Sequence, residues 1–468
     1  MVFSSLLFIF QFLPIALLLY YIAPKKSKNL VLFLVSLVFY SWGEVRYFPI
    51  MLATIIVNYI CALGIERASS KKKTSQARRR AFLIIALVIS FGFLFVFKYV
   101  DFFISNVNGL FNITIPLLKL TLPLGISFYT FQTLSYTIDV YRGTVKAEHS
   151  FVNTAAFVTL FPQLIAGPIV RYSDIQQELK SRTITPRMLE QGMEEFIIGL
   201  AKKVLIANNV GALWTEIEKM GFSSVSTPLA WLGALAFTLQ IYFDFSGYSQ
   251  MAIGLGHMIG FNFPPNFDNP YSSKSITEFW RRWHMTLSSW FKEYVYIPLG
   301  GNRKGYARQL FNMFVVWACT GFWHGASWNF VLWGLYYFVL LAIEKAGYLK
   351  FLDKHKAFAH VYTLIAVMLG WVLFAITDFS GLGIYFQRMF VPSLVSGGAA
   401  TVGVGYYLRN YAVSLALGCF FSTDTSSFVY GVVREKRAVK IILMLLLFLV
   451  SVAYLVDSTY NPFLYFRF

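Results

Sequence analysis

Long apolar stretches restrict what this chain can fold into. They lie at residues 3–23, 30–43, 48–65, 81–104, 117–138, 151–170, 228–260, 309–343, 358–377, 403–421 and 438–456. A helix needs about 20 predominantly apolar residues to cross the hydrocarbon core of a bilayer. The sequence therefore predicts an all-α integral membrane protein with about eleven transmembrane helices. The first stretch lacks the basic leader and the cleavage site of a signal peptide, so we expect it to be the first span.

Composition supports the bilayer as the solvent of this chain. Of its 468 residues, 57% are hydrophobic and only 13% are charged, whereas soluble chains average about 25% charged residues. The three cysteines, Cys61, Cys319 and Cys419, show no CxxC spacing. We therefore expect them to pack in the protein and to form neither a disulfide framework nor a zinc site.

The net charge of +18 raises the question of nucleic acid, but the basic residues are distributed as in a membrane protein. One basic cluster follows the first apolar stretch at 25–28, and a second lies at 67–80 between two others. Basic residues in short loops mark the cytoplasmic side of a membrane. Two apolar stretches separate the clusters and can cross and return, which predicts an amino terminus outside and no nucleic-acid partner.

Some apolar stretches are interrupted. Pro123, Pro162 and Pro168 lie inside them, and such breaks are tolerated where protein or a water-filled cavity shields the backbone. We therefore expect re-entrant helices as well as spans. The polar residues 171–200 predict a pair of interfacial helices on the cytoplasmic side. No soluble domain is expected.

A first chemically unusual segment runs from Ser275 to Phe291. Ser275 and Glu278 have the spacing of a capping box, so a helix is expected to begin there. On that helix five residues share one face, namely Trp280, His284, Leu287, Ser288 and Phe291. Glu278 and Arg282 form an i,i+4 pair. The basic residues that accompany this face are Arg281, Arg282, Lys292, Arg303, Lys304 and Arg308. Charge alone does not separate a site for an anionic group such as phosphate from a loop on anionic headgroups.

The second unusual segment contains His324, inside an apolar run from Phe311 to Ile343. Burying an ionisable group at membrane depth costs roughly 2 kcal/mol or more unless it lines a cavity or finds a partner, so function is the better interpretation. Gly321 and Gly325 flank it at GxxxG spacing, which suits helix packing at least as well as close approach of a ligand.

Histidine suits proton transfer because its ordinary pKa is about 6.5. A site of low dielectric favours the neutral ring, which is the form that a general base needs. His284 and His324 show no metal-binding spacing, and no metal is expected. A nucleophile elbow and a Walker lysine are both missing from the sequence, which argues against a hydrolase or an ATPase.

Six segments together resemble one known family. They are LPLGISFY at 122–129, FPQLIAGP at 161–168, IYFDFSGY at 241–248, EFWRRWH at 278–284, YVYIPLGGNR at 294–303 and FWHG at 322–325. In this order they resemble the membrane-bound O-acyltransferase (MBOAT) family, in its alginate O-acetyltransferase branch. The resemblance covers about Pro123 to Trp333 and returns at the carboxyl terminus. It implies a helical fold around a central tunnel, organised as one polytopic domain over 1–468: amino-terminal spans in 1–115, a catalytic core in 116–345, and carboxyl-terminal spans and a tail in 346–468.

The resemblance also implies an activity in the cell membrane. An acetyl group would pass from a cytoplasmic thioester, acetyl-CoA or an acyl carrier, towards an exported polysaccharide, without a permanently bound cofactor. An extracytoplasmic acetyltransferase resembling SGNH hydrolases would be the partner. His324 would be the essential base and His284 the second histidine. Asn329, His284 or a main-chain N–H would face the developing oxyanion. The donor- and tunnel-binding residues implied are Trp280, Arg281, Arg282, Ser288, Arg303, Trp323 and Asn329.

The ending at 461–468, NPFLYFRF, extends the resemblance. In the related teichoic-acid D-alanylation system, a small partner with a similar ending relays the acyl group through its tyrosine. By analogy Tyr465 would accept the acyl group; the alternative is an aromatic anchor in the headgroup region.

Two other functions stay open at this point. One is D-alanyl transfer to teichoic acid. The other, from a different class, is a solute or proton transporter with broken helices. A transporter reading has few intramembrane carboxylates to draw on, namely Asp139 and Asp244.

Overall fold

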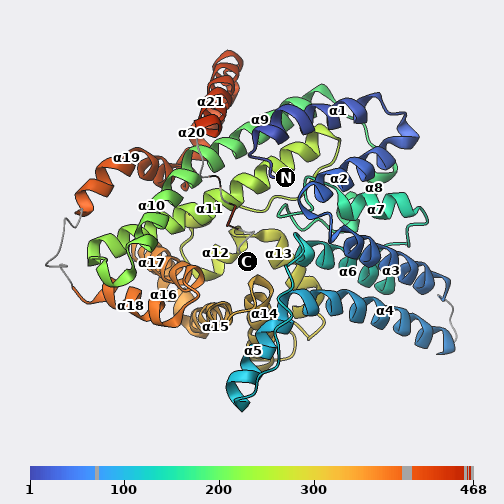
Figure 1. The fold of residues 1–468 in the computed structure, drawn as a ribbon, viewed down its shortest axis with the longest axis horizontal. Coiled ribbons are helices and arrows are strands. Elements are labelled where there is room, and N and C mark those ends of the chain that lie inside the picture. The colour runs from blue at the N-terminus through green and yellow to red at the C-terminus, as the bar shows by residue number, and fades with distance from the viewer. Residues whose placement is uncertain (69–72, 393–402, 458–460, 462, 465–468) are drawn as a thin grey trace. The chain divides into compact units, whose positions relative to one another are not determined.

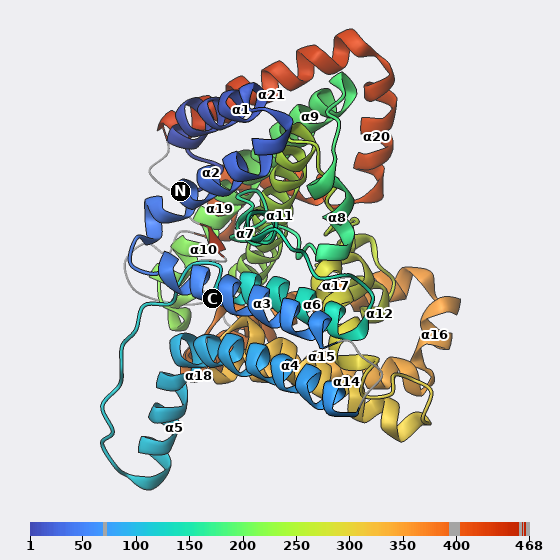
Figure 2. The same cartoon turned by 90° about the vertical axis from the view of Figure 1, so that its right-hand side faces the viewer.

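A computed structural model describes residues 1–68, 73–392, 403–457, 461, 463 and 464. Within these residues every regular element is helical (Figure 1, Figure 2). The chain forms two compact units: Met1–Phe196 with Met251–Pro264, and Ile197–Gln250 with Pro265–Phe468. The predicted all-α class is confirmed.

The first unit is built from short and medium helices. They are α1 (Leu13–Ile22), α2 (Lys28–Glu44), α3 (Phe48–Arg67), α4 (Lys73–Leu94), α5 (Val100–Phe111), α6 (Ile126–Arg142), α7 (Phe151–Thr159) and α8 (Tyr172–Lys180), followed by the start of α9 (Pro186–Ala201). Figure 2 shows α3 and α4 side by side. The apolar stretch at 151–170 is helical only as far as Thr159, and residues 161–166 follow as a buried turn. The prolines thus interrupt the helix as expected.

The second unit carries the rest of the chain. Its helices are α10 (Asn208–Lys219), α11 (Thr227–Met258, which ends in the first unit), α12 (Ile276–Arg282), α13 (Met285–Phe291), α14 (Tyr306–His324), α15 (Trp328–Ile343), α16 (Leu349–Lys354), α17 (Lys356–Ala375), α18 (Phe379–Phe390), α19 (Val404–Phe421), α20 (Asp424–Glu435) and α21 (Arg437–Asp457). Three π-helical segments join some of them, at Lys202–Ala207, Lys292–Tyr296 and Glu344–Tyr348. Its core is aromatic, with Trp283, Trp333 and Trp371 almost fully buried.

Seven helical segments in the described chain are long and apolar enough to cross a membrane. They are Phe48–Arg67, Ser75–Phe111, Pro186–Lys219, Thr227–Met258, Trp328–Lys354, Lys356–Ala375 and Arg437–Asp457. α19 and α20 make an eighth if their 83° bend belongs to one broken span. The predicted number of about eleven is not confirmed, because several apolar stretches form helices shorter than a span: α2 has 17 residues and α7 has 9.

The interfacial pair predicted at 171–200 is wrong in its second half. α9 continues through Lys202–Ala207 into α10, and the 34 residues Pro186–Lys219 form one of the seven candidate spans. The sequence misleads here because charged residues cluster in the first turns of this segment, whereas its continuation from Phe196 onwards is largely apolar and buried.

α14 and α15 form a closely packed hairpin that carries the FWHG segment (Figure 1). A Cβ atom added at Gly321 would overlap the carbonyl oxygen of Phe330, and one added at Gly334 would overlap that of Trp317. A Cβ at Gly325 would overlap the ring of Phe330. These glycines therefore serve close packing of the two helices, which places His324 at the end of α14 against α15.

Candidate active site

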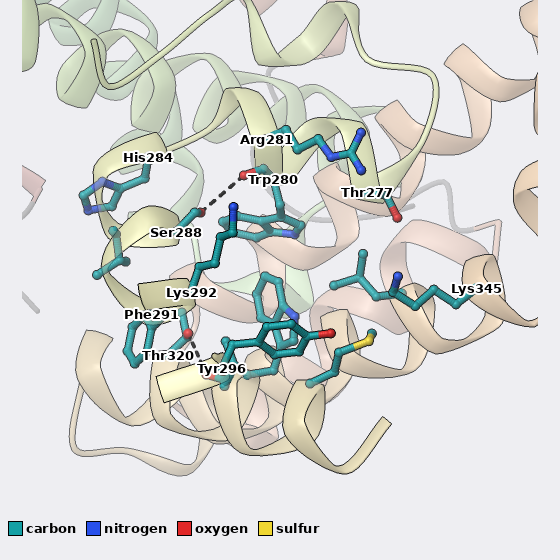
Figure 3. A pocket seen from close by; sticks show the side chains of 15 residues that line it. Thr277, Trp280, Arg281, His284, Ser288, Phe291, Lys292, Tyr296, Thr320 and Lys345 are labelled. Atoms are coloured by element: carbon teal, nitrogen blue, oxygen red, sulfur yellow. Dashed lines mark hydrogen bonds between the residues drawn. The ribbon is translucent and has the colours of Figure 1, made fainter. Parts of the chain in front are cut away.

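The second unit contains a cavity of about 280 Å³ between α12, α13, α14 and the end of α15 (Figure 3). Its walls are formed by Thr277, Trp280, Arg281, His284, Leu287, Ser288, Phe291, Lys292, Tyr296, Met313, Val316, Trp317, Thr320, Leu341 and Lys345. Figure 3 shows His284 and Ser288 on one side and Thr277 and Lys345 on the other. The cavity thus joins basic side chains to a largely aromatic interior.

The helix predicted from Ser275 to Phe291 is present as two shorter helices. The start is as expected, since the Ser275 hydroxyl accepts the N–H of Glu278 at 3.0 Å. The carboxylate of Glu278 accepts from Lys274 N–H, one residue before the N-cap, and it pairs with Arg282 at 2.8 Å as predicted. The break falls at His284, whose φ of 42° is left-handed. A continuous helix was therefore the wrong prediction.

Hydrogen bonds to a distant loop explain the break. The N–H of Met285 donates to the carbonyl of Asn266 at 2.9 Å, and the N–H of Asp268 donates to the carbonyl of Arg282 at 3.0 Å. The loop thus takes main-chain groups that would otherwise pair within one helix. Even so, all five residues predicted for one face line the cavity, from Trp280 to Phe291.

The tautomer of His284 follows from its neighbours. Asn266 Oδ1 accepts the main-chain N–H of Thr286 at 3.3 Å and its hydroxyl at 2.9 Å. Because an N–H can only donate, the Asn266 atom at this place is the oxygen. It lies 3.0 Å from Nδ1 of His284, so Nδ1 carries the proton. Nε2 then presents a lone pair, and no partner for it exists within the described part of the chain.

The same environment keeps His284 neutral. Its side chain is 1% exposed, and it lies outside the seven candidate spans. Desolvation lowers the pKa of His284 from 6.5 to about 3, because a buried cation without a counter-ion is disfavoured. The ring is therefore a neutral proton acceptor at physiological pH.

His324 ends α14 and is 5% exposed. Its ring makes edge contacts with Trp323 at 5.0 Å, Trp333 at 5.0 Å and Phe374 at 5.3 Å. Trp323 also contacts His284, with ring centroids 6.0 Å apart. The two predicted histidines therefore share one aromatic neighbour, although they are forty residues apart in the sequence.

An aromatic cluster joins the cavity to His324. Trp280 lines the cavity and contacts Trp317 at 4.7 Å, Tyr337 at 4.8 Å and Trp333 at 5.5 Å. Trp333 in turn contacts His324. His324 is not among the described lining residues, but Thr320, one turn earlier on α14, is. The pattern of i and i+4 places both on one side of that helix.

The predicted basic residues divide into two groups. Arg281 lines the cavity, together with Lys292 and Lys345. Arg282 pairs with Glu278 and lies 3.7 Å from Asp424, and Arg303 is exposed on the loop before α14. Among the described residues that line the cavity none is acidic, so its electrostatic field favours an anionic ligand.

The remaining predicted residues have local contacts. The Ser288 hydroxyl donates to the carbonyl of Trp280 at 3.3 Å. The Asn329 amide donates to the carbonyls of Phe374 at 3.1 Å and Leu373 at 3.4 Å at the end of α17. Tyr465 lies outside the described residues. No group of three metal-ligating side chains occurs in the described part of the chain.

Sequence reasoning missed the residue that holds α12 in place. Glu344 is fully buried and its carboxylate accepts the N–H groups of Ile276 and Thr277, at 2.7 and 2.8 Å, and the hydroxyl of Thr277 at 2.7 Å. A carboxylate at a helix amino terminus satisfies main-chain donors and complements the helix dipole. The sequence showed Glu344 only as a charge at the end of an apolar run.

Comparison with known proteins finds one matching family and several similar chains. The family model described as membrane-bound O-acyltransferase matches residues 144–386. The probable alginate O-acetylase AlgI of Azotobacter vinelandii is 37% identical over 505 residues, covering 100% of both chains. That of Pseudomonas aeruginosa is 42% identical over 80% of this chain and 72% of its own. The peptidoglycan O-acetyltransferase of Helicobacter pylori is 37% identical over 80% of this chain and 77% of its own.

Proposed function

The chain belongs to the membrane-bound O-acyltransferase family and is a multi-pass membrane O-acyltransferase, and we propose that it moves an acetyl group from a cytoplasmic thioester across the membrane towards an exported polysaccharide. The relatives that it matches over most of its length include O-acetyltransferases of alginate and of peptidoglycan, which supports acetyl as the group transferred. The acceptor would be a cell-surface or extracellular polymer.

One observation carries the proposal. A cavity with basic side chains and no described acidic lining residue leads through an aromatic cluster to two buried histidines. Phosphates of acetyl-CoA or of a phosphopantetheine arm suit Arg281, Lys292 and Lys345, because charge-assisted hydrogen bonds to phosphate are strong. The remaining donor contacts would come from Trp280, Ser288, Arg282, Arg303, Trp323 and Asn329. The thioester end would then point into the aromatic cluster.

The reaction needs one proton acceptor near the acyl carbon. Neutral His324 takes the proton of the acceptor hydroxyl while its oxygen attacks the thioester carbonyl carbon. The tetrahedral intermediate collapses, the carbon–sulfur bond breaks, and the proton passes to the leaving thiolate. His284, with its Nε2 lone pair, accepts a hydrogen bond and so orients the hydroxyl or the relay group. The indole N–H of Trp280 is a buried donor that can face the developing oxyanion.

The outward half of the path involves groups beyond the described cavity. Tyr465 would receive the acetyl group as an ester and pass it to an extracytoplasmic acetyltransferase resembling SGNH hydrolases. In that case the first acceptor hydroxyl is the phenol. The protein would lie in the cell membrane with its amino terminus outside. A Tyr465→Phe variant that exports acetyl groups as fast as the wild type would contradict the relay.

The catalytic assignment is tested in liposomes with labelled acetyl-CoA. His324→Ala is expected to lower label transfer to protein and acceptor by roughly a hundredfold or more, as for loss of a general base. His355→Ala, at an exposed histidine between α16 and α17, serves as the matched control. Equal transfer by wild type and His324→Ala would overturn the assignment.

A further inference from the structure

A buried ion pair lies in the second unit, between two candidate spans. Lys203 Nζ is 2.5 Å from Asp244 Oδ1, and the two side chains are 3% and 2% exposed. Lys203 belongs to the π-helical segment Lys202–Ala207 and Asp244 to α11. Apolar replacement of a buried ion pair often leaves stability unchanged or higher, and ionisable groups at membrane depth usually have a function. Stability alone is therefore a poor account of this pair.

The second oxygen of Asp244 holds the carboxyl-terminal segment. Oδ2 accepts the main-chain N–H of Leu464 at 2.8 Å, across 220 residues of sequence. The Leu464 side chain is 3% exposed and belongs to the hydrophobic core of the second unit. A charge-assisted hydrogen bond of this kind is stronger than a neutral one. With Lys203 on one oxygen and Leu464 on the other, Asp244 is committed to this contact.

Two further contacts fix the register of the segment. The Asn208 amide donates to Asn461 Oδ1 at 3.2 Å, and the Tyr248 ring stacks on Phe463 at 4.6 Å. Tyr248 follows Asp244 by one turn of α11, on the same side of the helix. Asn208 follows Lys203 by five residues, the hydrogen-bonding step of a π-helix. All three described residues of the segment are thus bound by side chains of α10 or α11.

The anchored segment is connected to the proposed site through α11. Phe245, next to Asp244, places its ring edge-on against His284, with centroids 4.7 Å apart. Phe245, Trp283 and Leu464 belong to the same hydrophobic core. A change in how Leu464 packs is therefore transmitted to the wall on which the His284 ring rests, because packed cores transmit strain.

We propose that Asp244, held by Lys203, is the positioning residue for the carboxyl-terminal segment, and that the docked segment keeps Phe245 and His284 in place for acyl transfer. The docking stands on the contacts alone, whereas its consequence for transfer rests on the proposed function. Asp244 touches neither donor nor acceptor in this account, so it acts through Leu464 and Phe245.

The sharpest variant removes the main-chain donor of the Asp244–Leu464 hydrogen bond. Leu464→Pro deletes the N–H that Asp244 accepts and leaves the Lys203–Asp244 pair intact, and Leu464→Met is its matched comparison because it keeps the N–H and the side-chain size. In liposomes with labelled acetyl-CoA, turnover of Leu464→Pro is expected to be roughly tenfold or more below that of Leu464→Met, as for loss of a hydrogen bond to a charged group. The KM for acetyl-CoA should differ by less than about twofold, since Arg281, Lys292 and Lys345, the residues proposed to bind the donor phosphates, have no described contact with the segment or Phe245.

A second measurement does not depend on activity. Lys203→Met with Asp244→Leu removes both charges together, which avoids leaving one buried charge unpaired. Hydrogen exchange of the Leu464 amide is expected to be slow in the wild type and roughly tenfold or more faster in the double variant, while exchange in α15 stays slow in both. Equal exchange at Leu464 in the two proteins would overturn the docking.

The two readouts separate the possible failures. If exchange at Leu464 accelerates but Leu464→Pro and Leu464→Met turn over equally, the segment docks and the positioning role is wrong. If Leu464→Pro instead raised the KM as much as it lowered turnover and also lost thermal stability, the segment would only stabilise the fold. That result would also overturn the positioning role. If His324→Ala transfers acetyl normally, the proposed function fails while the exchange result stands.

Discussion

At the residue scale, the tautomer of the His284 ring depends on a single amide oxygen, Oδ1 of Asn266. Asn266 Oδ1 accepts from Thr286 and from Nδ1 of His284, so Nε2 carries a lone pair. Burial keeps the pKa of His284 near 3. The group is therefore neutral throughout the range from about pH 5 to pH 9, and its own titration adds no limb to a pH–rate profile there.

Asn266→Asp is expected to add an acid limb to the pH–rate profile of acetyl transfer. A carboxylate beside Nδ1 stabilises the imidazolium and raises the pKa of His284. As the pH falls through the raised pKa, Nε2 gains a proton and loses its lone pair, so acetyl transfer should fall by roughly tenfold on the acid side, the size of a general acid–base effect at its lower limit. The measurement is transfer rate against pH.

Asn112→Asp, at an exposed position, is the control for the added charge. An acid limb that is the same in Asn266→Asp, Asn112→Asp and the wild type would contradict a proton-accepting role for Nε2 of His284.

His324 and His284 could be identified from sequence as candidates, because burying an ionisable group of an apolar segment costs free energy wherever the fold places it. Asn266 could not. It lies eighteen residues before His284 in a loop, and the hydrogen bond between them depends on a non-local approach that no local periodicity records. Glu344 escaped for the same reason, since its partners in α12 are 67 and 68 residues away.

At the element scale, the helix predicted from Ser275 to Phe291 shows how local and non-local hydrogen bonding compete. The capping signal at Ser275 placed the start correctly. The 3.6-residue period placed Trp280, His284 and Ser288 towards one cavity, because the break turns the chain without changing which side faces inward. The break itself comes from the loop at Asn266 and Asp268, whose contacts lie outside any window of helical periodicity.

Glu344 connects α15 to the start of α12, so its loss should be felt in the cavity. Glu344→Ala removes the acceptor of the buried N–H of Ile276 and of the partly buried N–H of Thr277, and a buried unsatisfied donor costs roughly 1–3 kcal/mol. Trp280 and Arg281 lie on the helix that is released. We expect a raised KM for acetyl-CoA and a lower thermal unfolding midpoint, measured on the purified protein.

Glu344→Gln keeps one acceptor oxygen at the same place and is expected to lie between wild type and Glu344→Ala in both quantities. If Glu344→Ala lowered the unfolding midpoint without changing the KM, the prediction that Glu344 supports the donor cavity through α12 would be contradicted.

The close packing of α14 on α15 leads to a second prediction for the elements, on the stability of a glycine variant. In Gly321→Ala the new methyl group would overlap the Phe330 carbonyl, so the helices must separate, and overpacking of this kind typically costs about 1–3 kcal/mol. Gly92→Ala on α4 is the matched control, because no atom lies within 4 Å of the added Cβ. There alanine should be neutral or stabilising by up to about 1 kcal/mol.

Thermal unfolding midpoints of the two variants in one detergent decide the matter. A Gly321→Ala protein as stable as Gly92→Ala would show that the hairpin has more room than its backbone contacts indicate.

At the scale of the whole molecule, apolar composition predicts the fold class, whereas loop charge predicts the orientation in the membrane. Composition predicted the helical membrane fold, since the outer faces of several spans stay apolar: only 17% of the apolar window of α21 is buried within the protein. It did not predict the number of spans, because helix ends and breaks depend on tertiary contacts such as the buried turn after Thr159. Loop charge bears on orientation alone.

Orientation can be tested with single cysteines in a chain whose three native cysteines are replaced by alanine. Ser75–Phe111 is a 37-residue candidate span of which only 17% of the apolar window is buried. If it crosses the bilayer, the exposed residues Gln76, at its start, and Thr121, beyond its end, are expected on opposite sides. From the basic residues at 78–80 we expect Gln76 to lie in the cytoplasm. In intact cells, a membrane-impermeant maleimide is expected to label Thr121→Cys at once and Gln76→Cys only after permeabilisation. Ser27→Cys, in the first basic cluster, should behave like Gln76→Cys. Labelling of Ser27→Cys in intact cells would instead place the two basic clusters on opposite sides of the bilayer, and the amino terminus could then no longer be assigned to the outside from loop charge.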